Sequence, residues 1–304
     1  MPKLFVTGAT GFLGSRLVER LRQLPHQIVA LSRSGAPPAA SAAAAAGGAV
    51  RLVRGDLNQS ASYAADLAGA DTVLHLAAVT GKARPHDYLR TNVEGTRALV
   101  ERCRAAGVRR FLFVSSIAVT FPDTRRYYYA RSKAEAERIV AASGLDFVIL
   151  RPTIIVGPGS PVLAGLRKLA GLPVVPVFGD GRAKVQPIFV ADLVDLILMV
   201  LEQERFRGET LELGGPQTPT IQEFMGEIHL RLCGKRARFV HLPLSLVLPS
   251  LALLEHVAYP VLPVTVGQLS TFRFDGTAAP NALLDSHRAR LTTLSEMVRR
   301  SLAG

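Results

Sequence analysis

Apolar residues in the first half of the chain form short continuous runs that alternate with stretches of helical spacing. In the helical stretches the apolar positions recur every three or four residues, as Leu13, Leu17 and Leu21 do. Strands that are apolar throughout and alternate with helices are typical of a parallel sheet covered on both faces. The sequence therefore predicts an α/β fold with a doubly wound parallel sheet. The apolar runs lie at residues 4–6, 28–31, 50–53, 72–76, 111–114 and 147–150, and the helical stretches at 13–24, 92–106 and 133–142.

The pattern changes after residue 152. Glycine and proline recur between residues 157 and 176, and fewer apolar runs follow. We expect loops and short helices with a few returning strands, as in a smaller C-terminal substrate-binding cap. The expected domains are 1–157 and 158–304, with a segment at about 174–200 returning to the first domain.

A glycine-rich turn joins the first strand to the first helix, with Gly8, Gly11 and Gly14 spaced GxxGxxG. The first glycine permits the tight turn, the second lets backbone approach a pyrophosphate, and the third lets the helix pack close to the strand. The free N–H groups at the helix start then face the anion. A strand before the motif and a helix after it predict a Rossmann-type domain that binds a dinucleotide. The expected contacts are Gly8, Thr10, Gly11, Phe12, Leu13 and Gly14.

The end of the second strand predicts which dinucleotide binds. NAD usually pairs its ribose with an acidic residue at this place. Here the strand ends in Ser32 and Arg33, with no Asp or Glu. A guanidinium supplies a planar fork of donors that suits a 2′-phosphate. We therefore expect NADP rather than NAD, and a solvent-facing Arg33 is the alternative.

Two further strand ends carry candidate cofactor contacts. Asp56 follows the third strand, where its carboxylate can accept from an adenine amino group or cap a helix that starts near Asn58. Small residues close the fourth strand, which lets backbone lie along the cofactor. His75 at that strand is expected to be a satisfied core histidine. The candidate contacts at these two ends are Asp56, Leu57, Leu76, Ala77 and Ala78.

The fifth strand and the helix after it carry a candidate catalytic group. Tyr129 and Lys133 are four residues apart, so they share one helix face. A nearby ammonium favours the phenolate and lowers the tyrosine pKa, which makes the side chain a usable acid or base. Ser116 at the strand end is expected to hydrogen-bond the reacting oxygen, and Lys133 can also hold a ribose hydroxyl. Ser115 is the weaker candidate for the serine.

These features together resemble the short-chain dehydrogenase/reductase superfamily, in its extended or atypical epimerase/dehydratase-like branch. The resemblance implies that Tyr129 is the general acid/base, that Lys133 lowers its pKa and binds the nicotinamide ribose, and that Ser116 orients the substrate oxygen. It implies nicotinamide contacts at Pro152, Thr153 and Ile154. The matching stretches are residues 7–14, 55–57, 75–78, 92–96, 114–116, 129–133 and 151–152.

The second half narrows this resemblance. Residues 178–181 and 185–193 look like the subgroup that contains the nucleotide-binding accessory subunit of respiratory complex I and its bacterial relatives. Asp192 is then expected to cap or brace a helix rather than to act in catalysis. The catalytic tyrosine is not always kept in that subgroup and the cofactor can be structural, so the presence of Tyr129 favours an active enzyme.

The connection between Ser116 and Tyr129 departs from the branch. It is shorter than in most extended members, and residues 117–122 are mostly apolar where many sugar-nucleotide epimerases place polar substrate contacts. Arg125 and Arg126 are expected either to meet an anionic substrate or to be solvated.

Composition and charge exclude several classes. With 48% hydrophobic and 20% charged residues, the chain is not of a disordered, collagen-like or coiled-coil type. Two cysteines, Cys103 and Cys233, form neither a disulfide scaffold nor a CxxC metal site, so we expect no metal and a reducing, cytoplasmic setting. The net charge is +12, but no nucleic-acid-binding motif accompanies it and we expect no nucleic-acid partner. Residues 35–49 are low in complexity and predict a surface loop.

Residues 240–266 are rich in leucine and valine, but prolines interrupt them, so they cannot span a bilayer as one helix. We expect cap helices over a hydrophobic substrate pocket. The alternative is a membrane-surface contact assisted by Lys235, Arg236 and Arg238. An apolar pocket favours a lipid, isoprenoid, quinone-like or aromatic carbonyl compound over a sugar nucleotide.

The sequence thus predicts an NADP-dependent oxidoreductase that acts on the carbonyl or hydroxyl of a small, fairly apolar molecule, by Tyr-Lys-Ser acid/base catalysis and hydride transfer. A cofactor-holding structural or assembly protein, related to the complex I accessory subunit, is the first alternative. A nucleotide-sugar epimerase or dehydratase is the second. The oligomeric state stays open.

Overall fold

The computed structural model describes residues 1–35, 50–262 and 264–303, so the predicted loop at 35–49 lies outside the described residues except for Gly35. The chain divides into two compact units. Unit 1 comprises Met1–Ser116, Ser132–Arg151 and Val194–Leu211. Unit 2 comprises Ile117–Arg131, Pro152–Leu193 and Glu212–Gly304. The segment that returns to unit 1 is therefore Val194–Leu211, where the sequence places the return at about 174–200.

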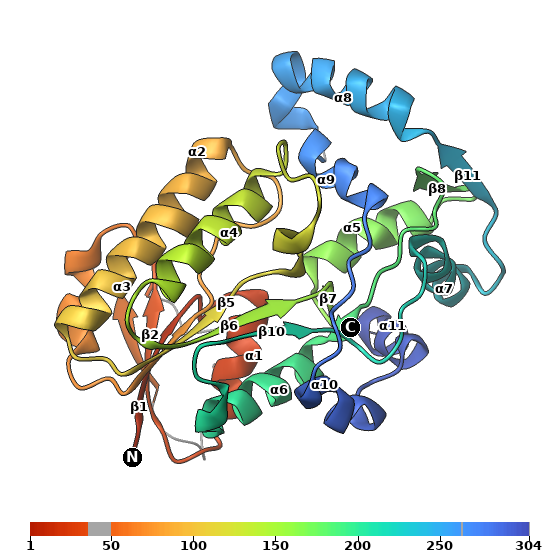
Figure 1. Ribbon diagram of the computed structural model, residues 1–304. Coiled ribbons are helices and arrows are strands. Elements are labelled where there is room, and N and C mark those ends of the chain that lie inside the picture. Colours follow the sequence, from red (N-terminus) through yellow and green to blue (C-terminus); the bar gives the residue numbers. More distant parts are fainter. Residues whose placement is uncertain (36–49, 263, 304) are drawn as a thin grey trace. The chain divides into compact units, whose positions relative to one another are not determined.

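A seven-stranded sheet forms the centre of unit 1, in the order β10-β6-β5-β4-β1-β2-β3 (Figure 1). From β6 to β3 each neighbouring pair is parallel. The strand order reverses between β1 and β4, and ligands of doubly wound sheets bind at such a reversal, beyond the carboxyl ends of the strands. The strands are β1 (Lys3–Thr7), β2 (Gln27–Ser32), β3 (Val50–Arg54), β4 (Thr72–His75), β5 (Arg110–Val114), β6 (Asp146–Pro152) and β10 (Glu209–Leu213).

Helices cover both faces of this sheet. Figure 1 shows α3 and α4 on one face and α1 and α6 on the other. The predicted α/β fold with a doubly wound parallel sheet is confirmed. The helices are α1 (Phe12–Leu21), α2 (Pro85–Tyr88), α3 (Gly95–Ala105), α4 (Tyr128–Ala141) and α6 (Val190–Glu202), with a π-helix η4 (Leu89–Glu94) between α2 and α3 and 3-10 turns η2 (Ser60–Ser62), η3 (Ala64–Leu67) and η6 (Glu204–Phe206).

A buried arginine fixes the end of α6 in unit 1. Arg110 is 7% exposed, and its guanidinium donates to the carbonyls of Val200 (2.7 Å), Leu201 (2.7 Å) and Gln203 (2.9 Å). The last carbonyls of a helix have no partner within the helix, and they attract a positive charge. Arg110 thus ties the carboxyl end of α6 to β5.

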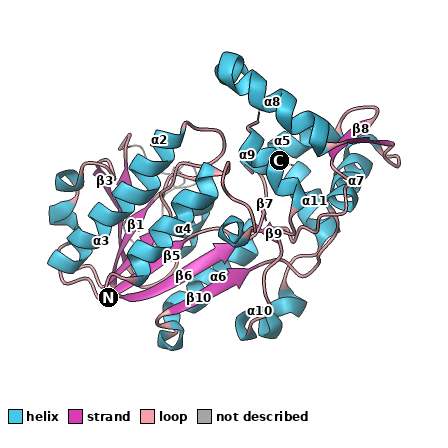
Figure 2. Cartoon of the chain, turned by 45° about the horizontal axis from the view of Figure 1, so that its top comes forward, coloured by secondary structure: helices cyan, strands magenta, loops and turns pink. Residues whose placement is uncertain are grey.

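Unit 2 is mostly helical, with two small parallel sheets (Figure 2). One sheet pairs β8 with β11 and the other pairs β7 with β9. Its main core gathers α5, α7 and α11 around residues such as Phe224 and Ile228. The elements are η5 (Ile117–Thr120), β7 (Ile155–Val156), α5 (Pro161–Ala170), β8 (Val175–Phe178), β9 (Ile188–Phe189), α7 (Ile221–Cys233), β11 (Phe239–Leu242), α8 (Leu244–Ala258), η7 (Tyr259–Val261), α9 (Val266–Ser270), η8 (Thr271–Arg273), α10 (Ala282–His287), η9 (Arg288–Arg290) and α11 (Leu294–Leu302).

The leucine-rich region forms a longer helix than its prolines suggest. Helix α8 runs through Pro249, at the loss of one backbone hydrogen bond. Within the described parts of the chain, no helix combines the length and apolar character needed to cross a membrane.

Candidate active site

Each of the three glycines in the turn after β1 suits its position for a different physical reason. Gly8 has φ 72°, and a Cβ on it would lie 2.6 Å from the amide nitrogen of Ala77. A Cβ on Gly14 would lie 2.0 Å from the carbonyl oxygen of Gly8, so only glycine lets α1 pack this close. A Cβ on Gly11 would meet only the Gly8 oxygen, at 3.2 Å. Gly11 therefore borders open space, where a ligand can approach the backbone.

The start of α1 suits an anion. Gly11 is the N-cap residue, and no side chain caps the helix or places an acid in its first turn. Thr10 is exposed, Phe12 is half-buried and Leu13 is buried. Arg16 stacks 4.5 Å from the centre of the Phe12 ring and donates to the Phe12 carbonyl at 2.7 Å. The first N–H groups of a helix need outside partners, so these residues fit the pyrophosphate of a dinucleotide.

Arg33 directly follows β2 and Arg54 ends the neighbouring strand β3, at the edge where dinucleotide-binding sheets hold the adenosine ribose. Ser32 is buried, with its hydroxyl 3.3 Å from that of Ser34, while Arg33 is exposed. Arg54 ends β3 in register with Ser32 and is also exposed. A Cβ on Gly35 would lie 3.6–3.8 Å from the Arg54 side chain, so Arg54 lies beside the turn that follows β2. Sequence reasoning missed Arg54, which counting the strand register could have found.

The structure gives Asp56 a local partner. Its Oδ1 accepts from the amide nitrogen of Asn58 (2.9 Å) and from the Asn58 side chain (3.1 Å). This is a turn formed by the side chain, and the short helix that follows begins two residues later, at Ser60. Leu57 is buried in the core of unit 1.

The loop after β4 is held by a buried asparagine. The Asn92 side chain accepts from the Val79 amide (2.7 Å), donates to the Val79 carbonyl (3.0 Å) and donates to the Ser132 hydroxyl (2.9 Å). Asn92 lies in the π-helix η4, and π-helical turns are frequent at functional sites. The loop that contains the half-buried Leu76, Ala77 and Ala78 is thereby tied to α4.

His75 is a satisfied core residue. It is fully buried, with Nδ1 2.6 Å from the Thr7 hydroxyl and Nε2 2.9 Å from the Thr96 hydroxyl. Burial, and to a lesser extent the charge of Lys133, lower the His75 pKa to about 3. The imidazole is therefore neutral at pH 7.

Lys133 is buried beneath the end of β5. It is 2% exposed, and its Nζ donates to the Val114 carbonyl at 2.6 Å and lies 4.2 Å from the centre of the Phe113 ring. Burial lowers the pKa of the Lys133 ammonium to about 7, partly opposed by Glu137. The two serines that follow Val114 differ, because Ser115 is 3% exposed and its hydroxyl has no hydrogen-bond partner among the described residues, while Ser116 is half-buried.

Helix α4 carries the tyrosine and the lysine on one face. Tyr129 lies one turn before Lys133 and is half-buried, with its ring 5.8 Å from that of Tyr127. Tyr128 is 43% exposed, and the Arg131 guanidinium lies 5.6 Å from its ring centre. Of the tyrosines on this helix, only Tyr129 thus shares a face with Lys133.

A partly buried ion pair anchors α4, and sequence reasoning missed it. Arg151 at the end of β6 donates from Nε and Nη2 to the two Glu137 oxygens, at 3.0 and 2.7 Å. Glu137 lies one turn after Lys133 and is 8% exposed. Two parallel hydrogen bonds fix orientation as well as distance. The pair holds the helix that carries the candidate catalytic residues against the sheet.

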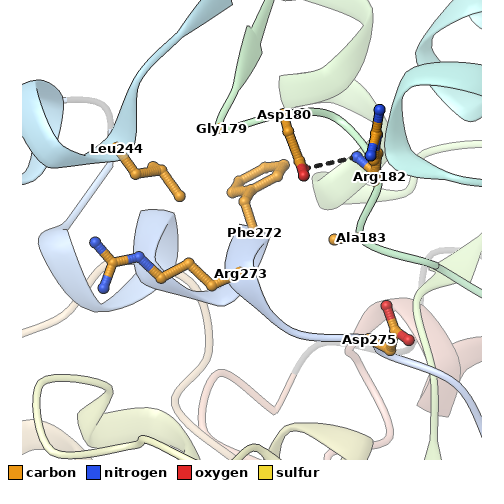
Figure 3. Close-up of a pocket in the computed structure, with 8 residues that line it drawn as sticks. All are labelled: Gly179, Asp180, Arg182, Ala183, Leu244, Phe272, Arg273 and Asp275. Atoms are coloured by element: carbon orange, nitrogen blue, oxygen red, sulfur yellow. Dashed lines mark hydrogen bonds between the residues drawn. The ribbon is translucent and has the colours of Figure 1, made fainter.

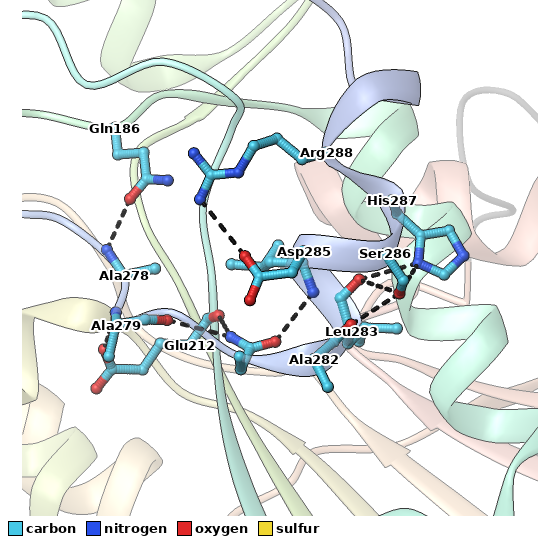
Figure 4. Close-up of polar contacts among 12 residues, drawn as sticks. Gln186, Glu212, Ala278, Ala279, Ala282, Leu283, Asp285, Ser286, His287 and Arg288 are labelled. Carbon is cyan, nitrogen blue, oxygen red and sulfur yellow. Dashed lines mark hydrogen bonds and ion pairs between the residues drawn. The ribbon is translucent and has the colours of Figure 1, made fainter.

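In unit 2, the residues after β6 are tied to a buried glutamine. The Thr153 hydroxyl donates to the Gln186 carbonyl, and its amide donates to Leu213 (2.9 Å). The Gln186 side chain in turn donates to Gly215 (2.7 Å) and accepts from Ala278 (2.8 Å; Figure 4). Pro152 is buried and Ile154 is half-buried.

Three other residues that the sequence singles out lie in unit 2. Asp192 accepts from the amide (2.7 Å) and hydroxyl (2.9 Å) of Thr292, so it braces the start of α6 rather than capping it. Arg125 is exposed and pairs with Asp123 at 2.8 Å. Arg126 is exposed, and its carbonyl lies where a Cβ on Gly267 would be 2.2 Å away.

Unit 2 has an open cavity of about 420 Å³ (Figure 3). Leu244 and Phe272 give it an apolar wall, and its other side chains are mostly charged. The expectation of a hydrophobic pocket beneath residues 240–266 does not describe this cavity, because most of those leucines and valines pack α8 against α9 or face solvent. The lining residues are Gly179, Asp180, Arg182, Ala183, Leu244, Phe272, Arg273 and Asp275.

Comparison with known proteins identifies the family. Residues 4–214 match the model of the NAD dependent epimerase/dehydratase family. The chain belongs to this family. The match includes the glycine-rich turn, the helix with Tyr129 and Lys133, and the segment around Asp192. Family membership makes the chain an NAD-binding Rossmann-fold protein of the epimerase/dehydratase type.

Three relatives are informative. The chain is 34% identical over 212 residues to a 2-alkyl-3-oxoalkanoate reductase of Stenotrophomonas maltophilia, and the match covers 62% of each chain. It is 36% identical over 191 residues to a ceramide reductase of Caulobacter vibrioides, and that match covers 62% of this chain and 57% of the relative. These matches span about three fifths of the length of those relatives. The chain is also 28% identical over 294 residues to NADH dehydrogenase [ubiquinone] 1 alpha subcomplex subunit 9 of Arabidopsis thaliana. This match covers 91% of this chain and 71% of that one. The predicted likeness to the complex I subgroup is confirmed.

Solved structures share the fold over the whole chain. The crystal structure of gox2253 superposes with a TM-score of 0.75 at 23% identity, covering 100% of this chain and 97% of that one. The structure of MoeE5 in complex with UDP-glucuronic acid and NAD superposes with a TM-score of 0.70 at 25% identity, covering 99% and 98%.

Proposed function

We propose that this protein is an NADP-dependent oxidoreductase that reduces the carbonyl, or oxidises the hydroxyl, of a small and largely apolar substrate. The observation that carries the proposal is the pair on α4, in which Tyr129 lies one turn before a buried Lys133 whose pKa is near 7. Two relatives are named as reductases of alkyl- or acyl-bearing compounds, which supports an apolar substrate.

In the proposed reaction each of these residues has its own role. The bound cofactor supplies or accepts a hydride at the substrate carbon. In reduction, the Tyr129 phenol donates its proton to the substrate oxygen, and the Lys133 ammonium favours the phenolate that is left. Ser116 donates a hydrogen bond to the same oxygen. In the reverse direction, the phenolate takes the hydroxyl proton.

The surroundings of Lys133 fit this role. The Val114 carbonyl accepts one of its protons and the Phe113 ring covers its charge, so Nζ is held in one place. A pKa near 7 lets the ammonium exchange a proton at ordinary pH. Glu137, the nearest acid on the same helix face, is occupied by Arg151.

The choice of NADP rests on Arg33 and Arg54. Both are exposed at the ends of neighbouring strands, and β2 ends without an acidic residue. A 2′-phosphate carries charge that two guanidinium groups can bind with several donors. Ser32 and Ser34 add hydroxyl groups at the same turn.

The test is turnover with NADPH and NADH across a panel of 3-oxo acids, long-chain ketones, quinones and aromatic aldehydes. Tyr129→Phe is expected to lower kcat by about 10²–10⁴-fold, the usual contribution of general acid/base catalysis. Tyr128→Phe is the matched control, because that side chain is on the same helix but exposed. A Tyr129→Phe variant that reacts at the parent rate contradicts the assigned role.

A cofactor-holding assembly protein is the second candidate, and the match to the Arabidopsis subunit over 91% of this chain favours it. It predicts no turnover with any carbonyl compound, together with co-purification with a respiratory complex. A third outcome is interconversion of nucleotide sugars with tightly retained NAD, which would make the protein an epimerase.

A further inference from the structure

Helix α8 and the turn η7 expose a continuous apolar face. Leu246, Leu253, Leu254, Val257 and Val261 are 68%, 71%, 45%, 78% and 80% exposed. Their spacing places them on one side of the helix. Apolar side chains that gather on one exposed face of a soluble protein often mark a binding surface.

One polar side chain of α8, the exposed Ser250, lies on this face one turn after Leu246. The Ser250 hydroxyl donates to the Leu246 carbonyl of its own helix at 3.0 Å. The Glu255 carboxylate accepts from the Val266 amide at 2.7 Å, where α9 begins. Glu255 is half-buried on the side of α8 that meets α9, so its negative charge lies away from the apolar face.

The exposed face is not needed to hold α8 in place. The opposite side of the helix has its own small core, in which Leu251 packs with Val266 and Leu269 of α9. Figure 1 shows α9 beside α8, and Figure 2 shows the same pair from another side. Folding thus accounts for one side of α8 and leaves the other unexplained.

Positive charge precedes this helix in the chain. Lys235, Arg236 and Arg238 are exposed just before β11, the strand that leads into α8. The whole protein carries a net charge of +12. Anionic lipids attract such residues by about 1 kcal/mol each near the membrane surface.

We propose that the apolar face of α8 and η7 docks on an anionic lipid surface, with Lys235, Arg236 and Arg238 facing the lipid headgroups. The face consists of leucine and valine, whereas protein interfaces concentrate their binding energy in tryptophan, tyrosine and arginine. An amphipathic helix with an apolar side and nearby basic residues lies in the plane of the headgroups rather than across the bilayer. This inference is independent of the catalytic role proposed for Tyr129.

The test is co-sedimentation of the full chain with vesicles of phosphatidylcholine, with and without a minority of phosphatidylglycerol. We expect strong binding only where phosphatidylglycerol is present, and weaker binding as salt is added. The double variant Leu253→Ser with Val257→Ser should bind the anionic vesicles with an affinity at least about tenfold lower, since two apolar side chains no longer insert. Lys235→Gln with Arg236→Gln should also weaken binding.

Matched controls separate this surface from general stickiness. Val162→Ser with Leu172→Ser changes two exposed apolar residues elsewhere in unit 2, and Arg167→Gln with Lys168→Gln removes the same charge from α5. Both controls should bind like the parent. The proposal is overturned if the parent ignores both vesicles, if the controls lose as much binding, or if Leu253→Ser with Val257→Ser instead dissolves a dimer, which would make the face a contact between two copies.

Discussion

Unit 1 and unit 2 differ in what fixes their polar groups. In the glycine-rich turn of unit 1, Gly11 and Gly14 meet backbone only a few residues away, although Gly8 also approaches Ala77 and Arg110 of the same unit reaches Val200. In unit 2 the joints are single side chains that bridge distant segments. Gln186 reaches Ala278, and Asp192 reaches Thr292, 100 residues away. Contacts between residues close in the chain leave a local sequence pattern, whereas side chains that bridge distant segments do not.

The largest effect is expected from Gly14→Ala, which tests the close approach in unit 1. Its Cβ would overlap the Gly8 carbonyl at 2.0 Å, and backbone cannot move aside cheaply. We expect a loss of about 3 kcal/mol or more in the free energy of unfolding. Gly165→Ala in α5 is the control, because nothing lies within 4 Å of its Cβ and alanine suits a helix. Urea denaturation measures both, and equal stability of the two variants would remove the argument from close approach.

Gln186→Leu tests the long-range joints of unit 2. The substitution leaves the Gly215 carbonyl and the Ala278 amide without their partner in a buried place. We expect a loss of about 2–4 kcal/mol in the free energy of unfolding, at about 1–2 kcal/mol for each of the two groups, because the Ala278 amide is only half-buried. Gln59→Leu, an exposed glutamine of unit 1, should change little. If urea denaturation finds the two variants alike, unit 2 does not depend on this side chain.

Arg33→Ala and Arg54→Ala sharpen the assignment of the cofactor edge. Each should weaken NADPH binding about ten- to a hundredfold, since a charged hydrogen bond contributes about 1.5–3 kcal/mol. NADH binding should change little, because NADH offers these residues no 2′-phosphate. Arg51→Ala is the control on the same strand, where the arginine pairs with Asp66 at 2.6 Å. Fluorescence titration with both cofactors decides, and unchanged NADPH affinity in both variants means that these arginines only face solvent.

The smallest change between neighbouring measurements concerns the pH dependence of stability, which is followed one pH unit at a time. The folded pKa of Lys133, about 7, lies below its ordinary value of 10.5, so between these pH values the unfolded chain holds a proton that the folded chain has released. Stability relative to Lys133→Met should therefore rise with pH across this window, by at most about 1.4 kcal/mol per pH unit. Below about pH 7 both states are protonated and the relative slope should vanish. Thermal unfolding of both proteins from pH 6 to 10 checks it, and a flat difference would mean that Lys133 keeps its charge.

The sequence predicts the sheet, the glycine turn and the buried role of His75 because each depends on neighbours close in the chain or on apolar surroundings. It does not predict the Glu137–Arg151 pair, since nothing in either local pattern says that these side chains meet. Asn92 has the same difficulty, because its partners Val79 and Ser132 come from separate segments. The sequence does not show which leucines of α8 pack against α9 and which face solvent, because an apolar stretch does not show which of its sides is covered.

Helix α4 belongs to both units, with Tyr129 counted in unit 2 and Lys133 in unit 1. One uninterrupted helix therefore carries both the candidate acid/base and the lysine that lowers its pKa. Their spacing does not depend on a contact between separate segments of the chain. A chimaera that exchanges unit 2 with that of a relative can be joined before Tyr128 or after Ala141 without altering this spacing. A recombination breakpoint inside the helix that adds or removes one residue would rotate the tyrosine by about 100° away from the lysine.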